Sequence, residues 1–153
     1  MSAMKILYCN DIEDTISNYI SKDKQFHGKT LYLTLKHVYK IIGKGSVDFG
    51  GSEYLEAEKE ISNPVKRAPE DKFGWWDLEQ GSYHIEFNER FENVVDRLFI
   101  ISPSRRVLLN GTFHPTIVTI DHKYAAKALL IVGCNGISIK ENARISICKI
   151  FEI

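Results

Sequence analysis

The sequence predicts a single all-β domain, a sandwich or barrel with one short helix near its N-terminus. Its length of 153 residues suits one ordinary domain. Apolar residues make up 44% and charged residues 26% of the chain, which excludes a fibrous or wholly disordered protein. From Gly74 onward, short apolar stretches recur at a spacing of roughly 8–12 residues, the pattern of consecutive β-strands.

Charge and cysteine content narrow the classes of function. The 20 Lys and Arg residues balance 20 Asp and Glu residues, so the formal net charge is zero. A net charge of zero gives no overall electrostatic reason to expect a nucleic-acid or membrane partner. The apolar runs are also far shorter than the roughly 20 residues of a membrane span. The segment 1–10 has no signal-peptide pattern. Cys9, Cys134 and Cys148 follow no disulfide or zinc spacing, so we expect reduced, largely buried thiols in a cytoplasmic protein.

The helix is predicted over residues 10–20. Asn10 or Asp11 can cap it, and Glu13 follows Asn10 at the spacing of a capping box. The polar segment 21–24 would end it. The apolar residues at helical intervals that would form its buried stripe are Ile12, Ile16, Tyr19 and Ile20.

Strands are expected to follow this helix. Leu31, Leu33 and Leu35 alternate with polar residues, the pattern of a half-buried strand. The charged segment 52–72 is predicted to be a solvated excursion of the single domain 1–153, with a helical stretch over 54–61. Asn135-Gly136 between two apolar runs predicts a hairpin turn. A stretch that would anchor the core is expected to begin at Trp75-Trp76. The further strands are expected at residues 83–87, 98–101, 117–120, 128–132, 137–139 and 143–147.

Two adjacent arginines mark the first candidate site. Arg105 and Arg106 lie between an apolar strand and a short apolar turn of helix, beside the hydroxyl of Ser104. Gly111 can end that turn in the left-handed conformation. Guanidinium groups suit bidentate phosphate contacts, and a helix start favours anions. The alternative is a solvated surface turn with an Arg–Glu ion pair.

The second candidate site is the segment 116–124. Asp121 follows an apolar strand and precedes Tyr124, so its carboxylate could orient a water or hold a metal at a pocket rim. The alternative is a turn-forming Asp that caps its own loop. His114 and His122 show no metal-ligand spacing.

The order of these features resembles the dUTPase and dCTP deaminase superfamily, especially its short archaeal members. The resemblance runs from the N-terminal helix to the last strand and leaves out the charged excursion. It is anchored at residues 78–89 and 103–111, continues through 114–124, and includes Ala143-Arg144-Ile145-Ser146, which is similar to a late Ala-Arg-Ile-Ala motif. Against the pattern Pro-Arg-Ser-Ser-Leu-Leu-Arg-x-Gly, three positions match without gaps: Pro103, Leu108 and Gly111. Five positions depart from it: Ser104, Arg105, Arg106, Val107 and Leu109.

This resemblance implies a distorted β-barrel or β-clip that forms a homotrimer with active sites between subunits. Asp121 would orient the water that attacks the α-phosphate of dUTP, giving dUMP and pyrophosphate. Tyr124 would pack against the deoxyribose. The positions carried over for binding the triphosphate, together with Mg²⁺, are Ser104, Arg105 and Arg106, and the other substrate-binding positions are Gly111 and Thr116.

Departures from the family pattern define the alternatives. The proton-shuttling glutamate of the deaminase branch falls at Ile131, which cannot shuttle a proton, so dCTP deamination is disfavoured. The early aspartate and arginine of the family fall at Tyr32 and Thr34. Because the chain ends at Ile153, a glycine-rich C-terminal arm over the site is not expected. The sequence thus leaves two hypotheses open, a dUTP pyrophosphatase and a non-catalytic trimer that binds a nucleotide or a partner protein.

Overall fold

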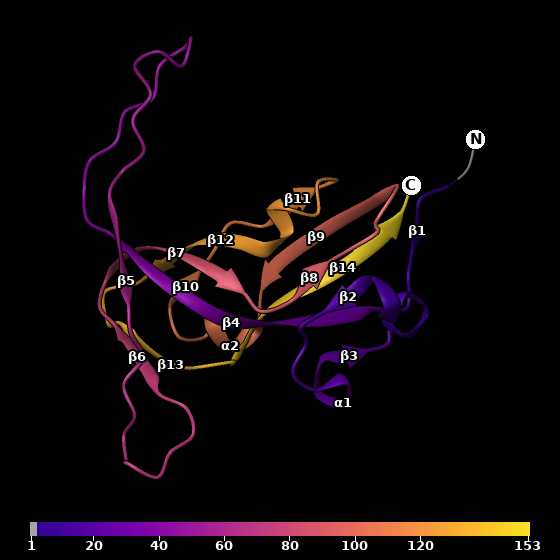
Figure 1. Cartoon of the computed structure of the whole chain (residues 1–153), viewed down its shortest axis with the longest axis horizontal. Coiled ribbons are helices and arrows are strands. Elements are labelled where there is room, and N and C mark those ends of the chain that lie inside the picture. The colour runs from indigo at the N-terminus through magenta and orange to yellow at the C-terminus, as the bar shows by residue number, and fades with distance from the viewer. Residues whose placement is uncertain (1–2) are drawn as a thin grey trace.

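The computed structural model describes residues 3–153 and consists mainly of short antiparallel strands (Figure 1). In chain order the elements are β1 (Lys5–Ile6), the 3₁₀ helix η1 (Cys9–Thr15), β2 (Ile16–Ser17), α1 (Lys22–Gln25), β3 (Phe26–His27), β4 (Thr30–Ile41), β5 (Lys59–Ser62), β6 (Trp75–Leu78), β7 (Gly81–Phe87), β8 (Arg90–Phe91), β9 (Arg97–Pro103), α2 (Arg105–Leu108), β10 (Thr112–Phe113), β11 (Ile117–Thr119), the 3₁₀ helix η2 (Tyr124–Ala126), β12 (Lys127–Val132), β13 (Ile137–Lys140) and β14 (Arg144–Glu152).

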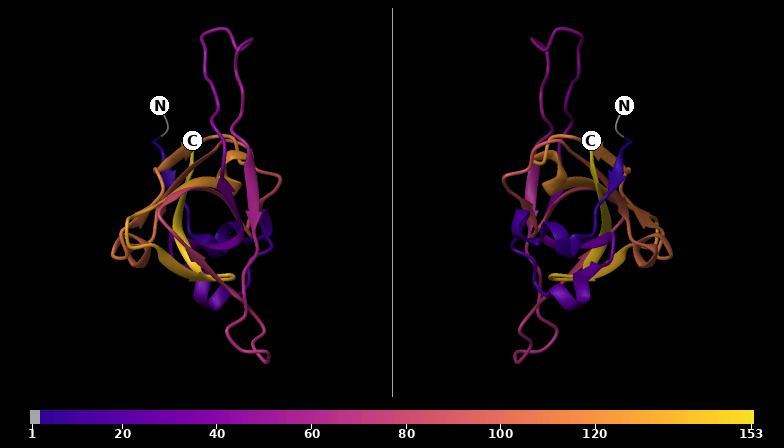
Figure 2. Two further views of the ribbon diagram at one scale, coloured as in Figure 1. Left: turned by 90° about the vertical axis from the view of Figure 1, so that its left-hand side faces the viewer. Right: turned by 90° about the vertical axis from the view of Figure 1, so that its right-hand side faces the viewer.

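One large antiparallel sheet carries the fold. Its strand order is β10-β12-β7-β4-β14-β9-β11, and β1, β3 and β5 add to it at β14 and β4. The long strand β4 joins the two halves, since it pairs with β7 on one side and β14 on the other. In the end-on views of Figure 2 the strands curl around a common interior. The predicted all-β architecture is therefore confirmed.

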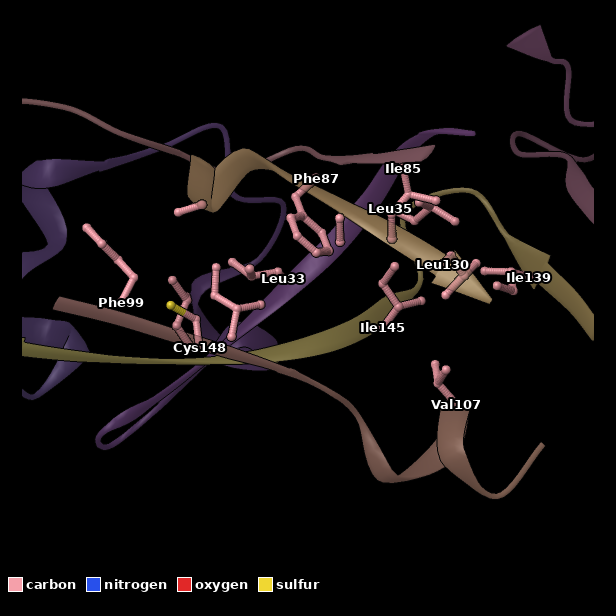
Figure 3. Close-up of a cluster of buried hydrophobic side chains, with 14 of the residues drawn as sticks. Leu33, Leu35, Ile85, Phe87, Phe99, Val107, Leu130, Ile139, Ile145 and Cys148 are labelled. Carbon is pink, nitrogen blue, oxygen red and sulfur yellow. The ribbon is translucent and has the colours of Figure 1, made fainter. Parts of the chain in front are cut away.

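The core lies inside this curled sheet. Leu31, Leu33 and Leu35 are fully buried, as their alternation in β4 predicted. Side chains from β4, β7, β12 and β14 point toward one another in Figure 3, where Leu33, Phe87 and Leu130 are examples. Because a buried aliphatic or aromatic side chain contributes roughly 1.5–3 kcal/mol, this shared interior is what holds the strands in register.

The N-terminal helix predicted over residues 10–20 is wrong in extent and type. A 3₁₀ helix occupies Cys9–Thr15 and is interrupted at Ile12, whose φ is −124°. The chain then extends into β2, where Ile16 pairs with Phe91 of β8. Ile20 is 56% exposed, so the predicted stripe does not stay on one face. Strand pairing prevails here because an isolated helix of this length is marginal on its own.

The excursion contains no helix over residues 54–61. Residues 42–58 instead form a long two-stranded arm that projects from the barrel (Figure 1), joined by a β-bridge between Ser46 and Leu55. β5 then continues the ladder and pairs with β4, with Lys40 opposite Glu60. A Cβ on Gly45 would lie 2.5 Å from the Leu55 carbonyl oxygen, so the two strands of the arm approach each other at a glycine.

The turn at Asn135-Gly136 exists, but the hairpin predicted from it is wrong. The Gly136 N–H donates to the Gly133 carbonyl at 3.0 Å, and Gly136 has a φ of +69° whereas Asn135 keeps a negative φ. The flanking strands do not pair with each other, because β12 pairs with β7 and β10 while β13 pairs with β6. A turn signal in the sequence cannot reveal that its two strands join different sheets.

The prediction of largely buried thiols holds for two of the three cysteines. Cys9 and Cys148 are free and buried, whereas Cys134 is free and exposed. Burial raises the pKa of both buried thiols, so they remain protonated and inert.

Among residues 3–153, no helix is long and apolar enough to cross a membrane.

Candidate functional site

A large surface cleft of about 1730 Å³ lies between α1, the end of α2, β6, β13 and the start of β14. Four basic side chains reach it from four different segments: Lys24, Arg106, Lys140 and Arg144. None of these four forms an ion pair within the described part of the chain. The cleft therefore combines convergent positive charge with open volume.

The acidic side chains of the cleft are already engaged. The Glu79 carboxylate lies 2.6 Å from Nζ of Lys40, and this pairing lowers the pKa of Glu79. Glu141 accepts a hydrogen bond of 2.6 Å from the Gly74 N–H. The third carboxylate, that of Asp77, accepts from the Ser138 hydroxyl. Each acid is bonded through one oxygen only, and the four bases outnumber the three acids of the cleft, so the cleft suits a polyanion.

The geometry of Arg144 is set by two neighbours. Its Nη1 donates to the Lys24 carbonyl oxygen at 2.9 Å, and its guanidinium lies 5.4 Å from the centroid of the Tyr32 ring. Arg144 and Tyr32 are both half-buried. A guanidinium held by one hydrogen bond and one aromatic ring keeps its other N–H groups available for a ligand.

The arginine–serine segment reaches the cleft only in part. Ser104 is buried, and its hydroxyl accepts a hydrogen bond of 3.4 Å from the Val107 N–H, so it caps α2. Arg106 and Gly111 line the cleft, while Arg105 is exposed outside it. Gly111 has a φ of +69°, which confirms the predicted left-handed end of this turn.

The residues of the second candidate site lie elsewhere. Thr116 directly precedes β11, and Asp121 and Tyr124 follow it. All three are exposed, and none of them lines the cleft. Asp121 Oδ1 accepts a hydrogen bond of 2.9 Å from the Lys123 N–H, so this carboxylate does stabilise its own turn. Its Oδ2 has no hydrogen-bond partner within residues 3–153 and faces solvent. Figure 1 shows β11 in the upper part of the molecule and α2 in the lower part, and Asp121 does not line the cleft of its own copy of the chain.

A buried acid that the residue patterns did not single out stands behind the cleft. Glu89 is fully buried, and one carboxylate oxygen accepts from the Thr34 N–H at 2.7 Å. The other oxygen accepts from the Thr34 hydroxyl at 2.5 Å and from Nε2 of Gln25 at 2.8 Å. Burial raises the pKa of Glu89 despite these bonds. Because Gln25 directly follows Lys24, Glu89 fixes the helix that presents this cation.

The sequence patterns also did not identify His114 as a buried residue that links two segments of the chain. It is buried, its Nδ1 lies 2.8 Å from the Pro115 carbonyl oxygen, and its Nε2 lies 2.7 Å from the Ser146 hydroxyl. Burial lowers the pKa of His114 and favours the neutral imidazole. The pair ties the loop that carries Thr116 to β14. The spacing of histidines along a sequence says nothing about which of them is buried.

The described residues of the cleft form no cluster of ligands that would hold a magnesium ion by themselves. Magnesium prefers one or two carboxylates in addition to water and substrate phosphates. The three carboxylates of this cleft each accept a hydrogen bond through one oxygen, from a lysine, a backbone N–H and a hydroxyl, and keep the second oxygen without a described partner. In the early strand, the position of the family's aspartate holds Tyr32, and the nearest charge over its ring is the guanidinium of Arg144. Within residues 3–153 no three His, Cys, Asp or Glu side chains cluster as ligands.

Comparison with known proteins identifies the family. The chain is 30% identical over 139 residues to a protein of Methanosarcina barkeri named "Probable deoxyuridine 5′-triphosphate nucleotidohydrolase". It is 29% identical over 133 residues to proteins of the same name from Methanosarcina mazei and Methanosarcina acetivorans. In each case the match covers 85% of this chain and 74% of the relative.

The solved structures agree on the fold. A 2′-deoxycytidine 5′-triphosphate deaminase from Agrobacterium tumefaciens superposes with a TM-score of 0.67 at 13% identity. The superposition covers 99% of this chain and 49% of that one, so the chain spans about half the deaminase. No family model matches the sequence. The identity, the coverage and the shared fold together show that the chain belongs to the dUTPase and dCTP deaminase superfamily.

Proposed function

We propose that the protein hydrolyses dUTP to dUMP and pyrophosphate. The observation that carries the proposal is the cleft, which offers four cations that make no ion pair within residues 3–153, in a chain similar to dUTP nucleotidohydrolases. A triphosphate is the most highly charged part of dUTP, and such a cleft neutralises it. Phosphoryl chemistry depends mainly on positioning and charge neutralisation, which a fixed set of cations supplies.

The proposed site is completed by a second copy of the chain. Within one copy, Asp121 and Tyr124 do not line the cleft that holds Arg106. The surface around them is unusually apolar for a free surface, since Ile120 is 70% exposed and Val118 is 62% exposed. A homotrimer that covers this surface and brings Asp121 to a neighbour's cleft satisfies both observations.

The reaction follows from this arrangement. Oδ2 of Asp121 accepts a proton from a water molecule as the water oxygen forms a bond to the α-phosphorus. The bond from that phosphorus to the bridging oxygen of the β-phosphate breaks, and its electron pair leaves with pyrophosphate. Arg106 and Arg144 stabilise the charge on the departing group. Tyr124, which is 69% exposed in the single chain, packs against the sugar.

Magnesium enters the proposal only as an ion carried by the phosphates of dUTP. Within residues 3–153 no three His, Cys, Asp or Glu side chains cluster as ligands, so no step is assigned to a metal held by the protein. A cytoplasmic location, with neither a nucleic-acid nor a membrane partner, belongs to the same proposal. The free, buried thiols of Cys9 and Cys148 support a reducing compartment.

A non-catalytic nucleotide-binding trimer is the second candidate. It is favoured by the hydroxyl of Ser104, which caps α2 instead of facing a phosphate, and by the turn that occupies Oδ1 of Asp121. Deamination of dCTP is less favoured, because Ile131 in β12 stands where a proton-shuttling glutamate is required.

Pyrophosphate release from dUTP distinguishes these candidates. The wild-type chain should release pyrophosphate, and Asp121→Asn should lower the rate by about 10²–10⁴-fold, the range of a lost general base. Asp14→Asn is the matched control, because Asp14 is exposed and lies outside the cleft. Absence of release at high enzyme concentration, with retained nucleotide binding, would establish the non-catalytic candidate. Ammonia release from dCTP would instead identify a deaminase.

A further inference from the structure

The arm formed by residues 42–58 does not line the cleft, and its surface is suited to a second copy of the chain. We propose that the arm of one copy packs against the β11 surface of a neighbouring copy, and that this contact closes the homotrimer. The β11 surface consists of two apolar and two basic side chains: Val118, Ile120, Lys123 and Lys127. The proposal shares the homotrimer with the function proposed above, but it does not depend on the hydrolysis of dUTP.

The first line of evidence is the apolar surface of the arm. Phe49 is fully exposed and Val47 is 88% exposed. Tyr54 and Leu55, on the returning strand, are each more than half exposed. A strand advances about 3.3 Å per residue, so the extended residues 42–48 carry the tip roughly 20 Å from the barrel. Figure 1 and Figure 2 show the arm pointing away from the rest of its own chain, which leaves these side chains uncovered.

The second line of evidence is that the tip is held in one conformation. The carboxylate of Asp48 accepts hydrogen bonds from the Gly51 N–H at 3.0 Å and from the Glu53 N–H at 2.9 Å. The Ser46 hydroxyl donates to the Glu53 carbonyl oxygen at 2.6 Å. Phe49 lies within the turn that these bonds close. Because a two-stranded hairpin alone in water is at best marginally stable, an ordered tip with exposed apolar side chains indicates a surface pre-organised for a partner.

The third line of evidence is the charge of the arm. Residues 42–58 contain one base, Lys44, and four acids, which are Asp48, Glu53, Glu56 and Glu58. None of these acids forms an ion pair within residues 3–153. Two arms would repel each other, so contact between the arms of two copies is disfavoured. The arm therefore favours a partner surface that is both apolar and basic.

The β11 surface has both properties. Val118 is 62% exposed and Ile120 is 70% exposed. Lys123 and Lys127 follow in the next segment, both exposed and without an ion pair among the described residues. The acid between them and β11, Asp121, bonds its own turn through Oδ1. β11 is also the last strand in the order of the large sheet, and an uncovered edge strand exposes backbone N–H and C=O groups. An extended segment from a neighbour covers the apolar side chains and this edge together.

The symmetry of the contact agrees with a closed trimer. The arm and the β11 surface are different patches of one chain, so a contact between them is head-to-tail. Such a contact closes into a ring when the rotation between copies allows it, and a threefold rotation gives the homotrimer. Each copy then contributes one arm and binds another. The contact also holds the segment that leads to Asp121, which links the arm to the assembly of the proposed site.

The first test is disulfide trapping between two variants of the full chain. Both carry Cys134→Ser, because Cys134 is the exposed thiol of the described residues. One variant adds Phe49→Cys and an affinity tag, and the other adds Ile120→Cys. After the two are refolded together and oxidised with diamide, we expect a covalent heterodimer on denaturing gels without reductant. Ile20→Cys in place of Ile120→Cys is the matched control, because Ile20 is 56% exposed but lines the cleft.

The second test does not depend on which two side chains meet. A chain with Val47→Asp and Phe49→Asp should lose the trimer and appear as a monomer in light scattering, because charge replaces the apolar contact. Val65→Asp is the matched control, because Val65 is 68% exposed but lies outside the arm, and this variant should stay trimeric. Circular dichroism establishes that all variants are folded. Val47→Cys supplies a second position for trapping if Phe49→Cys does not link.

The outcomes separate the possible contacts of the arm. Linking of Phe49→Cys to itself places the arm against another arm, and linking to Ile20→Cys places it in the cleft, so either result overturns the proposal. The proposal is also overturned if neither Phe49→Cys nor Val47→Cys links to Ile120→Cys, if the wild-type chain is monomeric, or if the doubly substituted arm leaves the trimer intact.

Failure of the proposed function looks different, because neither test uses dUTP. If the arm links to Ile120→Cys but the wild-type chain releases no pyrophosphate, this inference stands and the hydrolase proposal falls. If pyrophosphate is released but the arm does not link, the hydrolase proposal stands and this inference falls.

Discussion

The imidazole of His114 and the hydroxyl of Ser146 form a buried hydrogen bond of 2.7 Å that joins the loop after β10 to β14. On its other side, Nδ1 of His114 lies 2.8 Å from the Pro115 carbonyl oxygen. Since a carbonyl only accepts, Nδ1 carries the proton and Nε2 accepts from Ser146. Burial favours the neutral histidine, in which Nε2 accepts from Ser146, and the pair holds the loop that leads to Thr116 and Asp121.

This relationship predicts a pH dependence of stability. Burial holds the pKa of His114 in the folded state below its ordinary value of 6.5. The unfolded chain thus binds a proton first, so the contribution of His114 is complete above about pH 6.5 and is lost as the pH falls toward the folded pKa. His114→Gln should lower the free energy of unfolding by about 1–3 kcal/mol at pH 7.5. Urea unfolding from pH 5 to 8 should show this deficit shrinking toward pH 5, and a deficit independent of pH would contradict the assignment.

Glu89 predicts a pH dependence of the opposite sign. Burial raises its pKa above the ordinary value of 4.5, so the folded chain binds the proton more readily. The stability contributed by Glu89 is present below pH 4.5 and is lost as the pH rises through the folded pKa. Relative to Glu89→Gln, the wild-type chain should therefore become more stable as the pH is lowered from 7 to 4.5. Parallel stability curves for the two proteins over that range would refute this prediction.

Two phenylalanines in different surroundings test the placement of the core. Phe87 is fully buried among the strands, while Phe49 at the end of the arm is fully exposed. Phe87→Ala should cost about 3–5 kcal/mol of unfolding free energy. In chains diluted until they are monomeric, Phe49→Ala should stay within about 0.5 kcal/mol of wild type, as expected for an isolated surface position. Chemical denaturation measures both, and a large loss for Phe49→Ala under that condition would mean that the arm packs against its own chain.

How far the sequence predicts this structure depends on the range of the interaction. The alternation of Leu31, Leu33 and Leu35 predicts β4, and Gly111 predicts the end of α2, because both are local patterns. The helix over residues 10–20 fails because Ile16 pairs with Phe91, 75 positions away. Propensity and spacing along the chain cannot report such a partner.

The sequence indicates which residue types the candidate site contains, but not which of them the fold brings together. Arg106 and Gly111, two positions proposed to bind substrate, line the cleft. Ser104 does not present its hydroxyl to the cleft, because the first turn of α2 uses it as a cap. Glu89 is a charged residue, and hydropathy predicts such residues to be exposed. Its burial follows from donors on β4 and α1 that only the folded chain brings together.

The central claim is that Asp121 of one copy acts on a triphosphate held in the cleft of another. Asp121→Asn and Arg106→Gln should each be nearly inactive alone. When the two variants are unfolded and refolded together at equal amounts, sites that pair an intact Asp121 with an intact Arg106 should form. About a quarter of the sites in randomly mixed symmetric trimers are then complete.

The decisive measurement is the rate of pyrophosphate release from dUTP by this mixture, with each variant refolded alone as the control and mixed assembly verified by light scattering and an affinity tag on one variant. A rate near a quarter of wild type is predicted. A mixture that forms assemblies containing both variants, yet releases pyrophosphate no faster than the two variants refolded separately, would contradict the shared site.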